Sequence, residues 1–217
     1  MSTETLSKSE VEFTDFELEQ IDAELQSMNP LERVAWARET FGEDLIASTA
    51  FGVTSPIMLK LVSEVDPDIQ VVTMRFGHEN NKTKVLSDWY TGIFKLNRTI
   101  YTDNRTHTQD SDIQSSRKVE LFDKVLDEIK PRAVLFGVMR GQTVERDTMP
   151  FIERRGSFLA INPVLDVTPK EVDDFFRLSG YPKNKDYNDP AKGPDQKLEC
   201  GLHRPRSKER ISSPSLS

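Results

Sequence analysis

Along residues 11–180, short apolar runs alternate with segments whose apolar positions repeat at helical spacing. Runs typical of buried strands occur at 44–50, 69–74, 98–101, 133–138 and 157–161. The spacing predicts helices over 11–28, 30–41, 55–65, 82–94, 116–129 and 169–179. This alternation predicts an α/β fold: a doubly wound, mostly parallel sheet of five to six strands with helices on both faces.

The chain divides into three parts by composition. Residues 1–10 are polar and are expected to form a disordered lead. Residues 11–180 hold the alternating pattern and have enough length for one domain with its own core. Proline, glycine, lysine and asparagine dominate from residue 181 onward, so residues 181–217 are predicted to be a flexible C-terminal tail.

Composition and charge narrow the functional classes. Hydrophobic residues make up 36% of the chain, charged residues 30%, and the formal net charge is −7. An acidic chain with no basic stripe argues against general binding to nucleic acid or to a membrane surface. No run of 18 apolar residues occurs, and the first residues lack the pattern of a secretory signal. A soluble, cytoplasmic protein is therefore expected.

A first candidate site lies between the run at 44–50 and the helix that follows it. Ser48, Thr49, Thr54 and Ser55 offer hydroxyl groups, and Gly52 lets the backbone approach a ligand closely. Such a loop meets the positive end of a helix at the carboxyl end of a strand, which favours an anion. The alternative is an ordinary strand–helix turn with Ser55 as a cap.

A second candidate follows the most apolar run. Arg140 and Arg146 could bind phosphate or sulfate oxygens through their planar guanidinium groups, and Gln142 could orient them. The alternative is a solvated basic loop in which Arg146 pairs with Glu145 or Asp147.

The third candidate is Cys200, the one cysteine of the chain. Because there is only one, the chain can form neither an internal disulfide nor a cysteine-ligated zinc or iron–sulfur centre. Residues 197–210 hold five Lys or Arg against two Glu. Neighbouring cations stabilise a thiolate, whereas Glu199 acts against it. Gly201 gives the backbone freedom beside the thiol, and His203 could assist proton transfer. The alternative is an unstructured tail with an incidental cysteine.

Three motifs together resemble the phosphoadenosine phosphosulfate (PAPS) reductase family. The sequence ECGLH at 199–203 resembles the family's C-terminal active-site signature, and residues 48–55 resemble the modified PP-loop of the adenine nucleotide α-hydrolase-like fold. Residues 140–146 resemble the segment R-E-Q-S-x-x-R. The chain departs from the family's pattern at Arg75-Phe76-Gly77, where Asp-Thr-Gly is usual, and at Met139, where a paired arginine is usual.

The resemblance implies a thiol-dependent reductase of sulfate assimilation. The Cys200 thiolate would attack the sulfur of PAPS, releasing adenosine 3′,5′-bisphosphate and leaving an S-sulfocysteine. With no second cysteine, thioredoxin or glutaredoxin would supply the thiol that releases sulfite, and neither a bound cofactor nor an iron–sulfur cluster is expected. The family also makes a homodimer an option. The implied catalytic residues are Cys200 and His203, and the implied substrate-binding residues are Ser48, Phe51, Gly52, Ser55, Gly77, Arg140, Gln142, Arg146 and Lys197.

Two other functions stay open. One is a PP-loop enzyme that uses ATP to adenylate or thiolate a substrate, although residues 48–55 lack the form S-G-G-x-D-S. The other is a nucleotide-binding module without catalysis. A covalent adduct on the thiol distinguishes the reductase from both.

Overall fold

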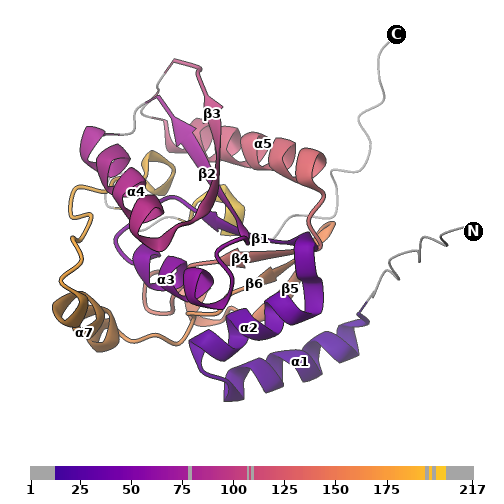
Figure 1. Cartoon of the computed structure of the whole chain (residues 1–217). Coiled ribbons are helices and arrows are strands. Elements are labelled where there is room, and N and C mark those ends of the chain that lie inside the picture. The colour runs from indigo at the N-terminus through magenta and orange to yellow at the C-terminus, as the bar shows by residue number, and fades with distance from the viewer. Residues whose placement is uncertain are drawn as a thin grey trace, which may run out of the picture.

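The computed structural model describes residues 13–77, 80–106, 108, 110–193, 196 and 199–203, with residue 203 described by its backbone alone. Their strands form one sheet in the order β3-β2-β1-β4-β6-β5 (Figure 1). The strands are β1 (Leu45–Thr49), β2 (Gln70–Phe76), β3 (Asn97–Asp103), β4 (Ala133–Phe136), β5 (Ile152–Arg155) and β6 (Phe158–Ile161). All neighbours are parallel except β5 and β6. The predicted α/β fold with a mostly parallel sheet is confirmed.

Helices cover both faces of this sheet. They are α1 (Asp15–Ser27), α2 (Pro30–Phe41), α3 (Ser55–Val65), α4 (Asn81–Phe94), α5 (Ser111–Ile129), α6 (Val144–Asp147) and α7 (Pro169–Ser179). On one face α2 packs against α3 and α3 against α4, whereas α5 contacts β2 and β3 from the other face (Figure 1). None of the described helices is both long and apolar enough to span a membrane.

The strand order reverses at β1. The chain passes from β1 to β2 and β3 on one side, and then returns to place β4 on the other side of β1. Both β1 and β4 are buried along their whole length, as expected for central strands of a parallel sheet. In open α/β sheets ligands bind beyond the carboxyl ends of the strands at such a reversal.

The helix boundaries follow local capping signals. Thr14, Asn29 and Thr168 each form a capping box with a glutamate three residues later, and Pro30 and Pro169 occupy the first helical turn. The starts predicted at Asn29-Pro30 and Thr168-Pro169 are confirmed.

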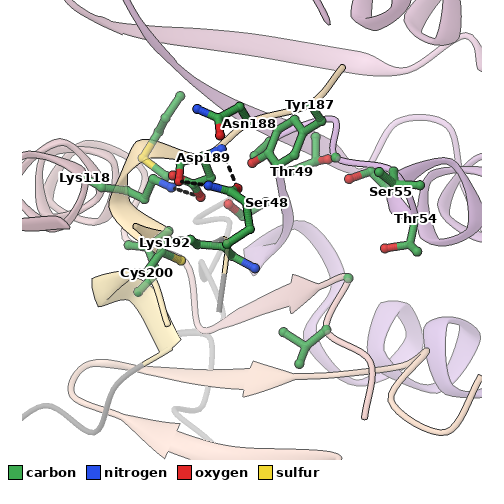
Figure 2. Close-up of a pocket in the computed structure, with 18 of the residues that line it drawn as sticks. Ser48, Thr49, Thr54, Ser55, Lys118, Tyr187, Asn188, Asp189, Lys192 and Cys200 are labelled. Atoms are coloured by element: carbon green, nitrogen blue, oxygen red, sulfur yellow. Dashed lines mark hydrogen bonds and ion pairs between the residues drawn. The ribbon is translucent and has the colours of Figure 1, made fainter. Parts of the chain in front are cut away.

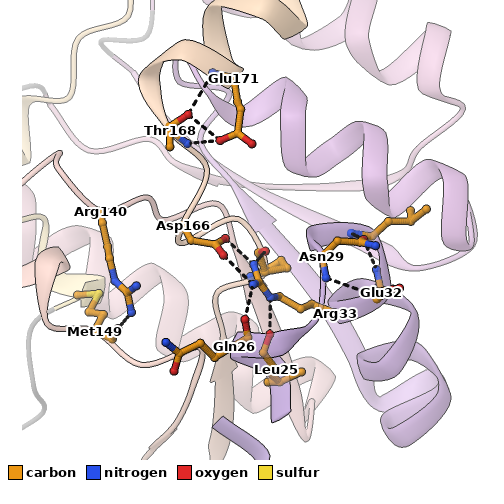
Figure 3. Close-up of polar contacts among 12 residues, drawn as sticks. Leu25, Gln26, Asn29, Glu32, Arg33, Arg140, Met149, Asp166, Thr168 and Glu171 are labelled. Carbon is orange, nitrogen blue, oxygen red and sulfur yellow. Dashed lines mark hydrogen bonds and ion pairs between the residues drawn. The ribbon is translucent and has the colours of Figure 1, made fainter. Parts of the chain in front are cut away.

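One buried arginine joins α1, α2 and the segment after β6. The Arg33 side chain is 1% exposed. It donates to the carbonyl oxygens of Leu25 at 2.7 Å and Pro163 at 2.9 Å, and it makes a two-pronged contact with Asp166 at 2.5 and 2.7 Å (Figure 3). Its guanidinium carbon also lies 4.1 Å from the centre of the Phe151 ring. Arg33 therefore holds these three segments together through hydrogen bonds and an ion pair, where a buried apolar side chain would be usual.

Two elements were not predicted, and one predicted strand is shorter than expected. β5 was not predicted, because its sequence IERR contains no apolar run and only its first and last residues are buried. α6 was not predicted either, since it has only four residues within a polar loop. The predicted fourth strand was longer than β4, so Gly137 and Val138 belong instead to the loop at the carboxyl end of the sheet.

The described part of the C-terminal segment is packed, in contrast to the flexible tail that composition suggested. Its two 3₁₀ turns, η2 (Pro190–Lys192) and η3 (Gly201–His203), contact α5. Asn184 is buried and donates to the carbonyl oxygen of Phe51 at 2.9 Å. The segment is held by paired polar groups, so a count of its apolar residues does not reveal that it packs.

Candidate active site

A cavity of about 570 Å³ opens at the carboxyl ends of β1, β2 and β4, where the strand order reverses. Its floor is formed by the ends of these strands through Ser48, Thr49, Met74, Phe76 and Phe136. Residues between 187 and 202, among them Tyr187, Asp189, Lys192 and Cys200, form the opposite wall (Figure 2). Residues remote in the sequence thus enclose one space.

The loop from β1 to α3 lines this cavity with small polar side chains. Thr49 accepts a hydrogen bond from the backbone N–H of Phe51 at 3.1 Å, which fixes the turn. Phe51 adopts a φ of 50° and is buried under the loop, outside the cavity lining. A Cβ on Gly52 would lie 3.4 Å from the Tyr187 ring, so a larger residue here would press on that ring. The turn leaves hydroxyl groups facing the cavity.

Cys200 lines the cavity and is 4% exposed. It lies near Lys118 of α5, whose ammonium donates to Asp189 at 2.5 Å (Figure 2). Burial opposes the charge on Lys118, but Cys200, Asp189 and Glu199 outweigh it and raise the pKa of Lys118. Burial likewise opposes the charge on Asp189, yet Lys118 holds the pKa of that carboxyl below its usual value. The pair stays ionised beside the thiol.

Lys192 is a second cation of the cavity. It is half-buried in η2, and among the described residues no hydrogen bond or ion pair reaches its ammonium group. Burial and then repulsion from Arg146 lower the pKa of Lys192, although Cys200, Glu199 and Asp189 act in the opposite direction. Lys192 is therefore a cation without a carboxylate of its own, in a place where an anion would stabilise it.

Arg146 binds Glu199, the residue before Cys200. Its Nε donates to Oε1 of Glu199 at 2.5 Å and one terminal nitrogen donates to Oε2 at 3.1 Å. The other terminal nitrogen donates to the side-chain oxygen of Gln142. The side chains of Arg146 and Glu199 are 6% and 1% exposed. This charge pair lies at the edge of the cavity, where both Arg146 and Gln142 line it.

The model of the phosphoadenosine phosphosulfate reductase domain matches residues 44–189 of this chain. The chain belongs to that family. The matched range covers the whole sheet and ends at Asp189, the partner of Lys118.

Relatives with the same description extend the match beyond that domain. The phosphoadenosine 5′-phosphosulfate reductase of Synechocystis is 28% identical, over 90% of this chain and 94% of its own. That of Synechococcus is 27% identical, over 86% of this chain and 97% of its own.

Solved structures share the fold. Phosphoadenylyl-sulfate reductase from Candida auris, in a phosphate complex, superimposes with a TM-score of 0.70 at 21% identity, covering 81% of this chain and 91% of that one. FMN adenylyltransferase from Candida glabrata reaches a TM-score of 0.57 at 12% identity, with coverage of 76% and 61%. These identities establish a likeness of fold alone.

The structure brings most of the residues implied by the family resemblance to one cavity. Those that line it are Ser48, Gly52, Ser55, Gln142, Arg146 and Cys200. Gln142 also approaches Thr54 of the first loop, with 3.5 Å between the amide nitrogen and the hydroxyl oxygen. The first two candidate loops and the cysteine segment are thus parts of one site.

Other implied residues lie elsewhere. Arg140 is exposed outside the cavity, where its guanidinium donates to the carbonyl oxygen of Met149 at 3.3 Å and lies over the Phe151 ring (Figure 3). Gly77 is exposed in the turn after β2 and does not line the cavity either. Lys197 and the side chain of His203 lie outside the described residues.

Sequence reasoning missed Lys118, Asp189 and Lys192. A signal for Lys118 exists: it lies three and four residues before Leu121 and Phe122 on the buried face of α5, an unusual position for a cation. Asp189 and Lys192 carry no such signal, because their segment has no periodic pattern and its contacts are with elements distant in sequence.

Proposed function

We propose that this protein is a phosphoadenylyl-sulfate reductase of sulfate assimilation, which reduces PAPS to sulfite and adenosine 3′,5′-bisphosphate. One observation carries the proposal: the Cys200 thiol shares a cavity with the hydroxyl-rich loop after β1 and with two lysines. The names of the relatives from Synechocystis and Synechococcus support PAPS over adenylylsulfate as the substrate.

In the first step the Cys200 thiolate attacks the sulfur atom of the sulfo group. A bond forms between the two sulfur atoms, and the bond from that sulfur to the bridging phosphate oxygen breaks. The bisphosphate leaves with the electron pair, and the cysteine carries an S-sulfo group. The ammonium groups of Lys118 and Lys192 put positive charge in the cavity that holds the thiol, which stabilises the negative charge growing on the leaving oxygen.

In the second step an external dithiol supplies two electrons. Its thiolate attacks the Cys200 sulfur, sulfite leaves with the electron pair, and the second thiol of the dithiol resolves the resulting mixed disulfide. Thioredoxin or glutaredoxin fits this role, because Cys200 is the one cysteine of the chain. The sequence of steps uses no resident cofactor or iron–sulfur cluster.

The decisive experiment is mass spectrometry of the intact protein after incubation with PAPS. We expect the mass to rise by one sulfo group on Cys200, and reduced thioredoxin to remove that group as sulfite. Adenylylsulfate, offered under the same conditions, should label the thiol more slowly.

The matched control is Cys200→Ser, which should bind adenosine 3′,5′-bisphosphate but acquire no adduct. A wild-type protein that binds the nucleotide without any adduct would contradict the proposal and favour a binding module. Cleavage of ATP to pyrophosphate that persists in Cys200→Ser would instead favour an ATP-dependent enzyme.

A further inference from the structure

We propose that Arg146 is a positioning residue, which holds Glu199 and thereby fixes Cys200 against the cavity, and that it is not a ligand of a substrate phosphate. This inference rests on the proposed function, in which Cys200 is the nucleophile. The contacts of Arg146 on which it is based are present whether or not the protein turns over a substrate.

The edge of the Arg146 guanidinium formed by Nε and one terminal nitrogen is already occupied within the protein. Two of its nitrogens face the two carboxylate oxygens of Glu199, and the third donates to Gln142. A phosphate binds arginine through the same planar pair of N–H groups. The carboxylate of Glu199 therefore takes the place that a phosphate would need at this edge of the guanidinium, and Gln142 takes one N–H of the remaining nitrogen.

Both described partners of the Glu199 carboxylate belong to α6 and its N-cap. Its Oε1 also accepts from the hydroxyl of Thr143 at 2.7 Å, and Thr143 caps α6, the helix that carries Arg146. The carboxylate is almost completely buried, and a buried carboxylate that loses its partner is strongly destabilising. The segment is thus held where Arg146 and Thr143 lie.

The contact controls Cys200 because the two residues are adjacent in sequence. The ion pair between Lys118 and Asp189 holds the same segment eleven residues before Cys200. One cation on α5 and one on α6 therefore fix this segment at two points. Arg146 also neutralises the carboxylate beside the thiol, which otherwise would oppose a thiolate.

Alkylation of Cys200 by iodoacetamide tests this directly, because no other cysteine reacts. The rates are compared on the alkaline plateau of each protein's rate–pH curve, where ionisation no longer limits the rate and access does. Arg146→Gln should then react about tenfold faster than wild type, since the segment is released. If Arg146 acted only through its charge, the variant would react at the wild-type rate or more slowly.

Nucleotide affinity and turnover separate positioning from phosphate binding. We expect Arg146→Gln and Glu199→Gln to lower kcat for sulfite release by about tenfold or more while affinity for adenosine 3′,5′-bisphosphate changes less than about threefold. The double variant should be no slower than the slower single one, because both remove one contact. A selective loss of nucleotide affinity in Arg146→Gln, with additive effects, would overturn the proposal.

Two controls keep the result interpretable. Arg177→Gln removes an arginine from the exposed pair with Asp174 on α7 and should leave every measurement unchanged. If Arg146→Gln does not fold, Arg146→Lys keeps the charge and loses the two-pronged contact, and it should show faster alkylation in the same direction. Alkylation and nucleotide binding need no turnover, so they decide this inference even where no sulfite forms.

Discussion

At Lys192 a single side chain gives the cavity a positive charge that no described carboxylate pairs with. We predict that Lys192→Met weakens binding of adenosine 3′,5′-bisphosphate about tenfold, because a hydrogen bond between charged groups contributes about 1.5–3 kcal/mol. Isothermal titration calorimetry measures the change. Lys170→Met, an exposed position on α7, is the matched control.

The same residue gives the binding reaction a pH signature. The pKa of Lys192 is lowered in the free protein, chiefly by burial, and a bound anion would raise it again. Ligand binding should therefore take up protons at alkaline pH, where free Lys192 has begun to lose its proton. Calorimetry in two buffers of different ionisation enthalpy reports this uptake, and equal heats in the two buffers for wild type would refute it.

At the scale of elements, Arg33 holds α1, α2 and the segment after β6 together. Arg33→Met keeps much of the volume but leaves three carbonyl groups and the half-exposed Asp166 carboxylate without their donor. We predict a loss of about 2–5 kcal/mol in the free energy of unfolding, because each buried carbonyl group left without a donor costs about 1–3 kcal/mol. Urea unfolding measures it, and Arg177→Met, whose pair with Asp174 is exposed, should cost far less.

The same scale shows why some elements escaped prediction. The central strands and the capped helices have local signals, since an apolar run or a threonine before proline defines each one. β5 forms because β6 offers it an edge, and its own residues include two arginines. A strand that depends on its neighbour rather than on its own pattern has no sequence signal to find.

At the scale of the whole molecule, the ion pair between Lys118 and Asp189 joins the C-terminal segment to the domain. Asp189→Asn leaves a buried ammonium without its counter-charge, so we predict a loss of about 3–5 kcal/mol in the free energy of unfolding. Asp174→Asn, which breaks the exposed pairs with Lys170 and Arg177 on α7, should cost less than about 1 kcal/mol. Equal losses in the two variants would show that the buried pair does not hold the segment.

The pH dependence of this stability follows from the direction of each pKa shift. The pKa of Asp189 is lowered on folding, so its contribution is complete above about pH 3.9, the unfolded value, and is lost as the pH falls through the folded value. The pKa of Lys118 is raised, so its contribution is complete below about pH 10.4 and is lost as the pH rises through the folded value. Asp189→Asn should flatten the acid limb, which denaturation curves at several pH values would reveal.

Sequence reasoning found the two loops and the thiol that meet in the cavity, because each follows a strand or carries a recognisable motif. It did not find how they are joined. Arg146 lines the cavity, as its motif indicated, but its contact with Glu199 of the cysteine segment has no signal in the sequence. Lys118 and Asp189 form a pair across a long stretch of chain, and only the folded arrangement shows that two such charges coincide.

The wall that carries Cys200 has a consequence for the order in which the site is made. Every strand of the sheet lies before residue 162, so a ribosome synthesises the floor of the cavity well before it synthesises the thiol. Domains tend to fold as units as the chain emerges. The floor of the cavity can therefore form first, and the thiol stays open to oxidants until its segment reaches Arg146 and Lys118. The sheet and the cysteine segment can thus assemble at different times. Docking of the cysteine segment both completes the cavity and shelters the reactive sulfur.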